Sequence, residues 1–272
     1  MKFNSFYALL DHYKGEIQEG PSRKFDADAL RGQVKAWITH LSQNHPIGQA
    51  VGILADNSLA WLSLDLACAN LDIALVPLPA FFTNEQLKHA VSEAGISTLV
   101  TDHGQRAQQL GFQLTPQDLN APMLMLRKLQ LDGSTPAQIQ KITFTSGTTG
   151  EPKGVCLTEA QQLAVAEGLM HATASLGIQR HLCLLPLSVL LENIAGVYAP
   201  MMAGADIICP PLEQTGLKGA ASFDAQLCLD TIASYRAESI ILLPQMLMAL
   251  LQASTPGDCR WQSLKFIAVG GG

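Results

Sequence analysis

Short apolar runs with the spacing of β-strands alternate with longer helical patterns along most of this chain, and this alternation most restricts its fold. Residues 50–55 (AVGILA) form a continuous apolar run, residues 56–58 offer capping side chains for a helix that reaches residue 69, and residues 73–78 form the next apolar run. A strand–helix–strand order gives parallel strands, because the helix returns the chain to the end of the sheet at which the first strand began. We therefore predict an α/β protein with mostly parallel sheets covered by helices.

Caps such as Asp26 and the Thr83–Gln86 capping box define further helices. The predicted helices cover residues 5–13, 26–42, 56–69, 83–94, 159–174, 190–202, 223–236 and 245–252, and the predicted strands cover residues 50–55, 73–78, 98–101, 141–145, 155–157, 181–185, 205–209, 239–243 and 264–269. Between residues 102 and 137 the periodicity weakens around several prolines. We place a boundary there, with a first α/β lobe at residues 1–137 and a second at residues 138–272.

Composition narrows the functional classes. With 272 residues, 48% apolar and 15% charged, the chain is able to bury a large core, which we expect in two packed lobes. A net charge of −6 argues against a nucleic-acid-binding surface. No signal peptide or transmembrane run is evident, and six widely spaced cysteines without a metal-binding motif favour free thiols in a reducing compartment. We expect no metal ligands in this chain and a cytoplasmic protein, with peripheral contact with a membrane left open.

One segment, residues 145–154 (TSGTTGEPKG), carries a chemical signal. It holds three glycines, four hydroxyl side chains, a proline and Lys153 between two strand patterns. Glycines let the backbone approach a ligand, successive amides form an anion-binding concavity, and the lysine adds positive charge. We predict a polyphosphate site and rank a hairpin without a ligand below it. The P-loop motif is excluded, because Gly154 follows Lys153 where Ser or Thr is required.

This segment resembles the phosphate-binding signature of the adenylate-forming enzymes, which include acyl-CoA synthetases, adenylation domains of peptide synthetases and luciferases. The matching residues are Thr145, Ser146, Gly147, Thr148, Thr149, Gly150, Pro152, Lys153 and Gly154. The resemblance implies that this segment binds ATP and that Lys153 is a catalytic residue that offsets the charge of the leaving pyrophosphate. Residues 265–272 (KFIAVGGG) resemble the family's adenine-binding strand and turn, which implies nucleotide contacts from Gly270 and Gly271.

Residues 185–192 (LPLSVLLE) resemble the family's acid-binding segment. Glu192 falls where long-chain acyl-CoA synthetases carry a glutamate, but Val189 stands where a histidine or aromatic residue is usual, and valine has no hydrogen-bonding group. Two interpretations of Glu192 remain open, a substrate-site residue and a surface charge favoured by the helix dipole. We interpret His181 as an isolated histidine with a structural or solvated role. Four apolar residues are expected to be core rather than pocket residues: Leu190, Leu191, Ile194 and Met201.

The resemblance implies an AMP-forming acid–thiol ligase that uses ATP to convert an apolar, fatty carboxylic acid into an acyl-adenylate and then passes the acyl group to coenzyme A. It covers nearly the whole chain but only about the first half of such an enzyme. The Mg²⁺-binding glutamate and the small C-terminal domain are expected beyond residue 272, so we expect this portion, which resembles a truncated large domain, to be nearly inactive alone. The alternative hypothesis is a non-catalytic nucleotide-binding or interaction domain on the same scaffold.

Overall fold

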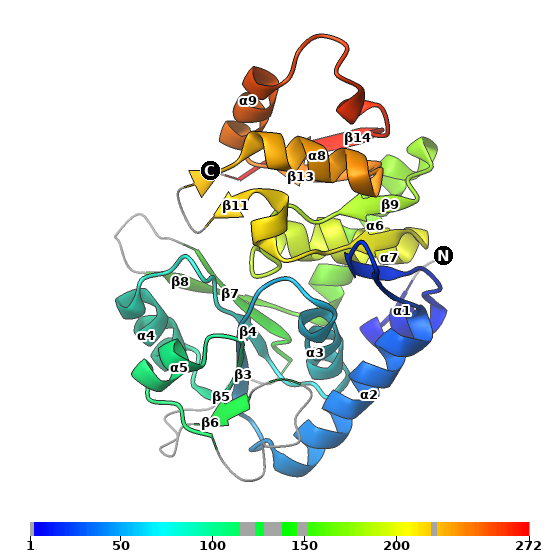
Figure 1. Cartoon of the computed structure of the whole chain (residues 1–272). Coiled ribbons are helices and arrows are strands. Elements are labelled where there is room, and N and C mark those ends of the chain that lie inside the picture. Colours follow the sequence, from blue (N-terminus) through cyan, green and yellow to red (C-terminus); the bar gives the residue numbers. More distant parts are fainter. Residues whose placement is uncertain are drawn as a thin grey trace.

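Two six-stranded sheets with helices between and outside them make up the protein (Figure 1). The computed structural model describes residues 3–114, 123, 125–127, 138–145, 152–218 and 222–271. The first sheet has the strand order β6-β5-β3-β4-β7-β8, and the second has the order β14-β13-β9-β10-β1-β2. Four neighbouring strands of the first sheet and five of the second run parallel, with antiparallel strands only at edges. The predicted α/β class is confirmed.

The strands are short and mostly lie where the apolar runs predict them. The first sheet contains β3 (Ala50–Leu54), β4 (Leu75–Pro77), β5 (Ile96–Thr101), β6 (Met125–Arg127), β7 (Lys141–Thr145) and β8 (Lys153–Leu157). The second contains β1 (Ile17–Gly20), β2 (Arg23–Phe25), β9 (Arg180–Leu182), β10 (Asp206–Ile208), β13 (Ser239–Leu242) and β14 (Phe266–Val269). A separate pair joins β11 (Leu217–Lys218) to β12 (Ser222–Phe223).

Several of the helices begin at caps that the sequence indicates, whereas α5 was not predicted. The helices are α1 (Phe6–His12), α2 (Ala27–Asn44), α3 (Leu59–Asn70), α4 (Asn84–Glu93), α5 (Gly104–Gln109), α6 (Glu159–Thr173), α7 (Ala199–Ala203), α8 (Ala225–Tyr235) and α9 (Pro244–Ala253), with 3₁₀ turns at Ala174–Leu176, Leu212–Thr215 and Cys259–Trp261. The Asp26 carboxylate accepts from the amide of Ala29 at 2.8 Å, and both bonds of the Thr83–Gln86 capping box form. The predicted helix 190–202 differs, because Glu192–Tyr198 (η3) is π-helical and leads directly into α7.

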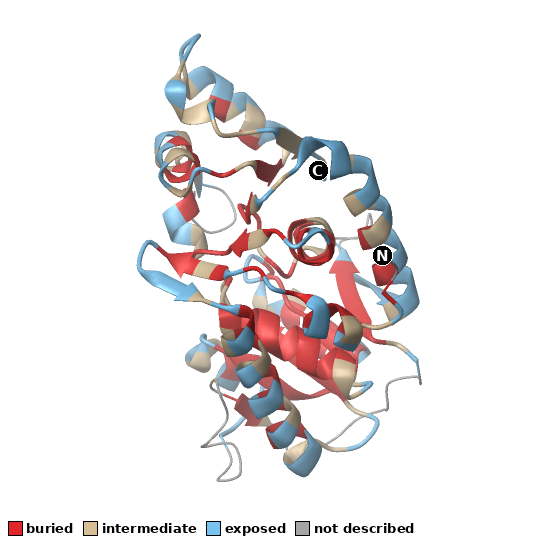
Figure 2. Cartoon of the chain, turned by 90° about the vertical axis from the view of Figure 1, so that its right-hand side faces the viewer, coloured by how far each residue is buried: buried red, intermediate tan, exposed pale blue. Residues whose placement is uncertain are grey.

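Three buried clusters fill the spaces between these layers. One lies on the outer face of the first sheet under α4 and α5, and another lies on the second sheet under α8 and α9. The largest joins the two sheets through α1, α2, α3, η3 and α6. Figure 2 shows buried residues gathered in these central layers and exposed residues along the outer helices. Among the described residues, no helix combines the length and apolar character needed to cross a bilayer.

The two sheets do not divide the chain at residue 137, where the sequence suggested a boundary between lobes. Strands β7 and β8 follow residue 137 but belong to the first sheet, where β7 pairs with β4 and β8 pairs with β7. Strand β1 of the early hairpin pairs with β10 of the second sheet. The reason is that a loss of periodicity reports where regular structure stops, and strand pairing depends on distant partners that leave no local signal.

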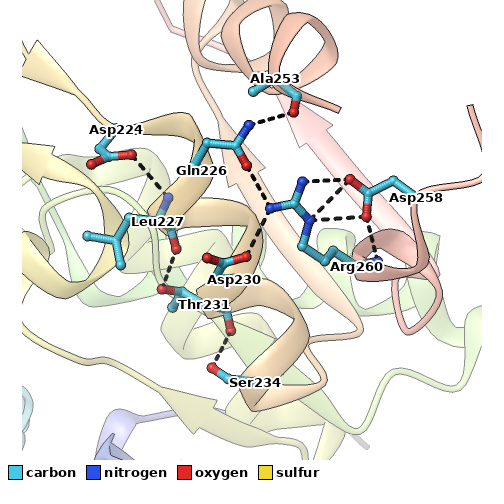
Figure 3. Close-up of polar contacts among 9 residues, drawn as sticks. All are labelled: Asp224, Gln226, Leu227, Asp230, Thr231, Ser234, Ala253, Asp258 and Arg260. Carbon is cyan, nitrogen blue, oxygen red and sulfur yellow. Dashed lines mark hydrogen bonds and ion pairs between the residues drawn. The ribbon is translucent and has the colours of Figure 1, made fainter. Parts of the chain in front are cut away.

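A surface cluster around Arg260 attaches the segment after α9 to α8 (Figure 3). The guanidinium of Arg260 donates to Asp258 at 2.7 Å, to Asp230 at 2.9 Å and to Gln226 at 2.8 Å. Gln226 also donates to the carbonyl of Ala253 at the end of α9. This cluster therefore lies entirely within the layer that covers the second sheet.

Candidate functional site

The glycine-rich segment connects the paired ends of β7 and β8. Thr145 is the last residue of β7, Lys153 is the first residue of β8, and the two are register partners with exposed side chains. Strand β7 is parallel to β4, so Thr145 lies at the carboxyl end of a parallel strand, where open α/β sheets bind ligands. The remaining predicted phosphate-binding residues lie outside the described residues: Ser146, Gly147, Thr148, Thr149 and Gly150.

The two predicted adenine-site glycines lie in the other sheet, directly after β14. Gly270 donates its amide to Leu242 at 3.1 Å, and a β-carbon at Gly270 would lie 3.4 Å from Leu191. Gly271 has a φ of +83°, which L-residues with side chains rarely adopt. The structure therefore places Gly270 next to Leu191 of the predicted acid-binding segment, whereas Thr145 and Lys153 come from the first sheet.

Glu192 is fully buried, so the interpretation as a helix-surface charge is wrong. Its Oε1 lies 3.0 Å from Nε2 of His181, and its Oε2 accepts from the amide of Leu185 at 3.0 Å. This carboxylate holds the start of η3 against β9 and against the turn that follows it. Val189, partly buried, lies in that turn, where its amide donates to Pro186 and its carbonyl accepts from Asn193.

His181 is buried and has partners on both ring nitrogens, which rules out a solvated role. Nδ1 lies 2.8 Å from Oγ of Ser239, its register partner on β13. His181, Cys183 and Glu192 together bring three potential metal-ligand atoms within 4.8 Å of one another. The hydrogen bonds already satisfy the imidazole and the carboxylate, and burial, with the Glu192 charge, raises the pKa of the Cys183 thiol, so this group needs no metal to be stable.

Gly196 packs against this buried group. A β-carbon at Gly196 would lie 2.7 Å from Nε2 of His181 and closer still to Oε1 of Glu192. Only glycine therefore fits beside the His181–Glu192 pair without displacing it.

A second buried polar group, which we call the Lys141 cluster, consists of Lys141, Asp65, Asn193 and Tyr198. The ammonium of Lys141 lies 2.9 Å from Oδ1 and 3.0 Å from Oδ2 of Asp65, and it donates to the Tyr198 hydroxyl at 2.7 Å and to the Asn193 amide oxygen. Asn193 and Tyr198 in turn donate to Oδ2 of Asp65. All four side chains are buried, so the charges are balanced inside the protein rather than by water.

The electrostatics of the Lys141 cluster follow from this burial. Desolvation lowers the pKa of Lys141, and the adjacent Asp65 carboxylate opposes that shift. The Lys141 cluster was not predicted from the sequence. One signal for it is present, since Asp65 is the only charged residue in the mostly apolar helix α3. A single charge on a helix that is buried on all sides requires a partner from another element.

An apolar groove of about 670 Å³ lies between α6 and η3. Its lining combines one residue of β8 with faces of both helical segments: Leu157, Gln161, Gln162, Ala164, Val165, Leu169, Leu190, Leu191, Ile194 and Ala195. A smaller cavity of about 110 Å³ shares Leu169, Leu191 and Ala195 with it and extends to His181. Ile194 and Met201 are buried in the core as expected, and Ile194 also borders the groove. Leu190 and Leu191 are only partly buried and line the groove.

Solved structures define the class of this fold. ATP-bound MatB from Rhodopseudomonas palustris matches with a TM-score of 0.75 at 20% identity, covering 100% of this chain and 55% of that one. O-succinylbenzoate coenzyme A synthetase (MenE) from Bacillus subtilis, in complex with AMP, matches with a TM-score of 0.73 at 19% identity, covering 98% and 67%. At these identities the matches establish the fold, which is that of the N-terminal part of adenylate-forming enzymes.

The chain belongs to the AMP-binding enzyme family, whose model matches residues 28–272. Among curated proteins, 2-succinylbenzoate–CoA ligase of Bacillus anthracis is 26% identical over 244 residues, which is 86% of this chain and 45% of that protein. Vanchrobactin synthetase VabF of Vibrio anguillarum is also 26% identical over 244 residues, or 8% of its length. The chain therefore spans less than half of the length of these relatives. The family match confirms the resemblance to adenylate-forming enzymes.

Proposed function

We propose that the protein containing this chain is an AMP-forming ligase that activates an apolar carboxylic acid with ATP and transfers the acyl group to coenzyme A. The observation that carries this proposal is the groove between α6 and η3, because its lining is almost entirely apolar and begins at Leu157 on the strand that Lys153 starts. Binding pockets for apolar ligands have this composition. The groove supports an aliphatic acid over a small polar one.

In the proposed reaction, a carboxylate oxygen of the acid forms a bond to the α-phosphorus of ATP, and the bond from that phosphorus to the bridging oxygen breaks to release pyrophosphate. Lys153 and the amides of the glycine-rich segment bind the β- and γ-phosphates and stabilise the departing charge. The thiol sulfur of coenzyme A then forms a bond to the acyl carbon, and the bond from that carbon to the phosphate oxygen breaks. AMP leaves, and the thiol proton is released to solvent. Mg²⁺ would further neutralise the phosphates, and we assign none of its ligands to this chain.

Pyrophosphate exchange into ATP, measured on the whole protein with acids of increasing chain length, tests the proposal. We expect exchange with aliphatic acids and a large loss of exchange for Lys153→Ala, because one preorganised charge at a developing anion contributes about 10²- to 10³-fold to the rate. Absence of exchange with every acid, from a folded protein that still binds ATP, would contradict the proposal and favour the non-catalytic nucleotide-binding domain.

A variant of the groove tests the acid class separately. Val165 lines the groove and is 53% exposed, so Val165→Glu places a charge there with little risk to folding. We expect a raised KM for long aliphatic acids and an unchanged KM for ATP. Met248→Glu, at a residue of α9 that is 56% exposed, is the matched control and should leave both KM values unchanged. Equal effects of the two substitutions would exclude the groove as the acid site.

A further inference from the structure

The π-helical segment η3 is held from two sides by separate buried polar groups. Glu192, the first residue of η3, is bonded to His181 on β9 of the second sheet and to the amide of Leu185 in the turn after β9. Asn193 and Tyr198 of η3 belong to the Lys141 cluster, in which they are bonded to Asp65 of α3 and Lys141 of β7. A π-helical segment of seven residues is rare, and such segments are frequent at functional sites. The two buried polar groups hold this segment in place.

The remaining face of η3 forms a wall of the apolar groove. Leu191, immediately before η3, lines the groove together with Ile194 and Ala195, whereas Asn193 points to the cluster behind. A ligand that displaces this wall therefore acts directly on the hydrogen bonds of Asn193 and Tyr198.

Strand β7 joins the Lys141 cluster to the glycine-rich segment. Lys141 is its first residue and Thr145 its last, and β7 pairs with β4 on one side and with β8 on the other. All five residues of β7 are paired with β8, and rigid paired elements of this kind can carry coupling between distant sites. We therefore take β7 as the path from Lys141 to Thr145, where the glycine-rich segment begins.

We propose that Lys141 is a positioning residue that couples the acid groove to the glycine-rich segment, so that acid in the groove changes the affinity for ATP. This inference rests on the proposed function, since it takes the groove as the acid site and the glycine-rich segment as the phosphate site. Lys141 touches neither substrate and acts through η3 and β7.

The test is the ratio of dissociation constants for α,β-methylene ATP, a non-reactive analogue, without and with a saturating aliphatic acid. Lys141→Met alone leaves the Asp65 carboxylate buried without its cation and is expected to destabilise the protein. The double variant Lys141→Met/Asp65→Leu removes both charges, and replacing a buried ion pair by apolar residues of similar volume usually preserves folding. Tyr198→Phe removes a single hydroxyl from the cluster and serves if the double variant does not fold.

In the wild-type protein we expect a ratio of about 5 to 150, the usual range for coupled sites. The ratio should fall to about 1 in the double variant and to an intermediate value in Tyr198→Phe, while unfolding stays cooperative. Arg260→Met is the matched control: it removes a basic residue with several polar partners from a cluster within one layer (Figure 3), and it should leave the ratio unchanged.

Either of two results overturns the proposal: a wild-type ratio of 1, or a wild-type ratio retained in both cluster variants. The second result would mean that the Lys141 cluster only stabilises the fold. Pyrophosphate exchange distinguishes these failures from failure of the proposed function. Exchange without coupling contradicts the role of Lys141 alone, whereas no exchange with any acid contradicts the function and, with it, this role.

Discussion

Replacing Gly196 by alanine is expected to destabilise the protein, although alanine is the better helix former. The added β-carbon would lie 2.7 Å from Nε2 of His181, which is inside van der Waals contact and against a ring held on both sides. Overpacking of this kind costs about 1–3 kcal/mol. Separating His181 from the buried Glu192 carboxylate costs about 1.5–3 kcal/mol more, as for other hydrogen bonds to charged groups.

The helix propensity of alanine offsets about 1 kcal/mol of this cost. The free energy of unfolding should therefore fall by about 1.5–5 kcal/mol. The result should appear in urea unfolding as a lower midpoint at an unchanged slope. Gly168→Ala is the matched control, because Gly168 is an exposed residue of α6 and a β-carbon there meets nothing within 4 Å. That variant should be more stable than wild type by about 0.5–1 kcal/mol.

A Gly196→Ala protein as stable as wild type would refute this reasoning, since it would mean that the His181–Glu192 pair shifts without cost. Destabilisation by both alanines would also contradict it, because the effect would then reflect helical glycines in general rather than the packing at Gly196.

Two further predictions concern ionisation and thiol reactivity. Burial raises the pKa of Glu238, but hydrogen bonds from the Gln179 amide and the Lys265 ammonium outweigh burial and hold the pKa below its ordinary value. The stability that this carboxylate contributes is therefore present above its pKa in the unfolded state and is lost as pH falls through its pKa in the folded state. Glu238→Gln should flatten the acid side of a plot of unfolding free energy against pH. Of the six cysteines, only Cys156 and Cys259 are exposed, so a thiol reagent should label two residues rapidly in the native protein and six after denaturation; fast labelling of more than two would contradict the described burial.

Local features of this fold were predictable because local residues determine them. The caps at Asp26 and Ser58 and the capping box at Thr83 each satisfy helix amides from within three residues, and each forms as expected. Apolar runs located most of the parallel strands for the same reason, but not β1, which pairs in parallel with β10. The phosphate-binding residues from Ser146 to Gly150 stay a prediction, since they lie outside the described residues.

Features that depend on distant contacts were not predictable. Glu192 has the sequence context of a surface helix terminus, and only the approach of β9, through His181, shows that it is buried. From the sequence alone, Lys141 is the polar first residue of a strand. Only the structure shows that it is bonded to Asp65, 76 residues earlier in the chain. In both cases elements that are far apart in the chain pack together and bury the charged residue next to its partner. A local sequence pattern does not show such packing.

The pairing of β1 with β10 has a consequence for synthesis of the protein. Ile17 is paired with Ile207, so the N-terminal hairpin leaves the ribosome 190 residues ahead of its partner strand. At translation speeds of about 5–20 residues per second, this edge remains unpaired for roughly 10–40 s. Throughout that interval the nascent hairpin presents unpaired backbone groups, which are able to pair with strands of neighbouring chains.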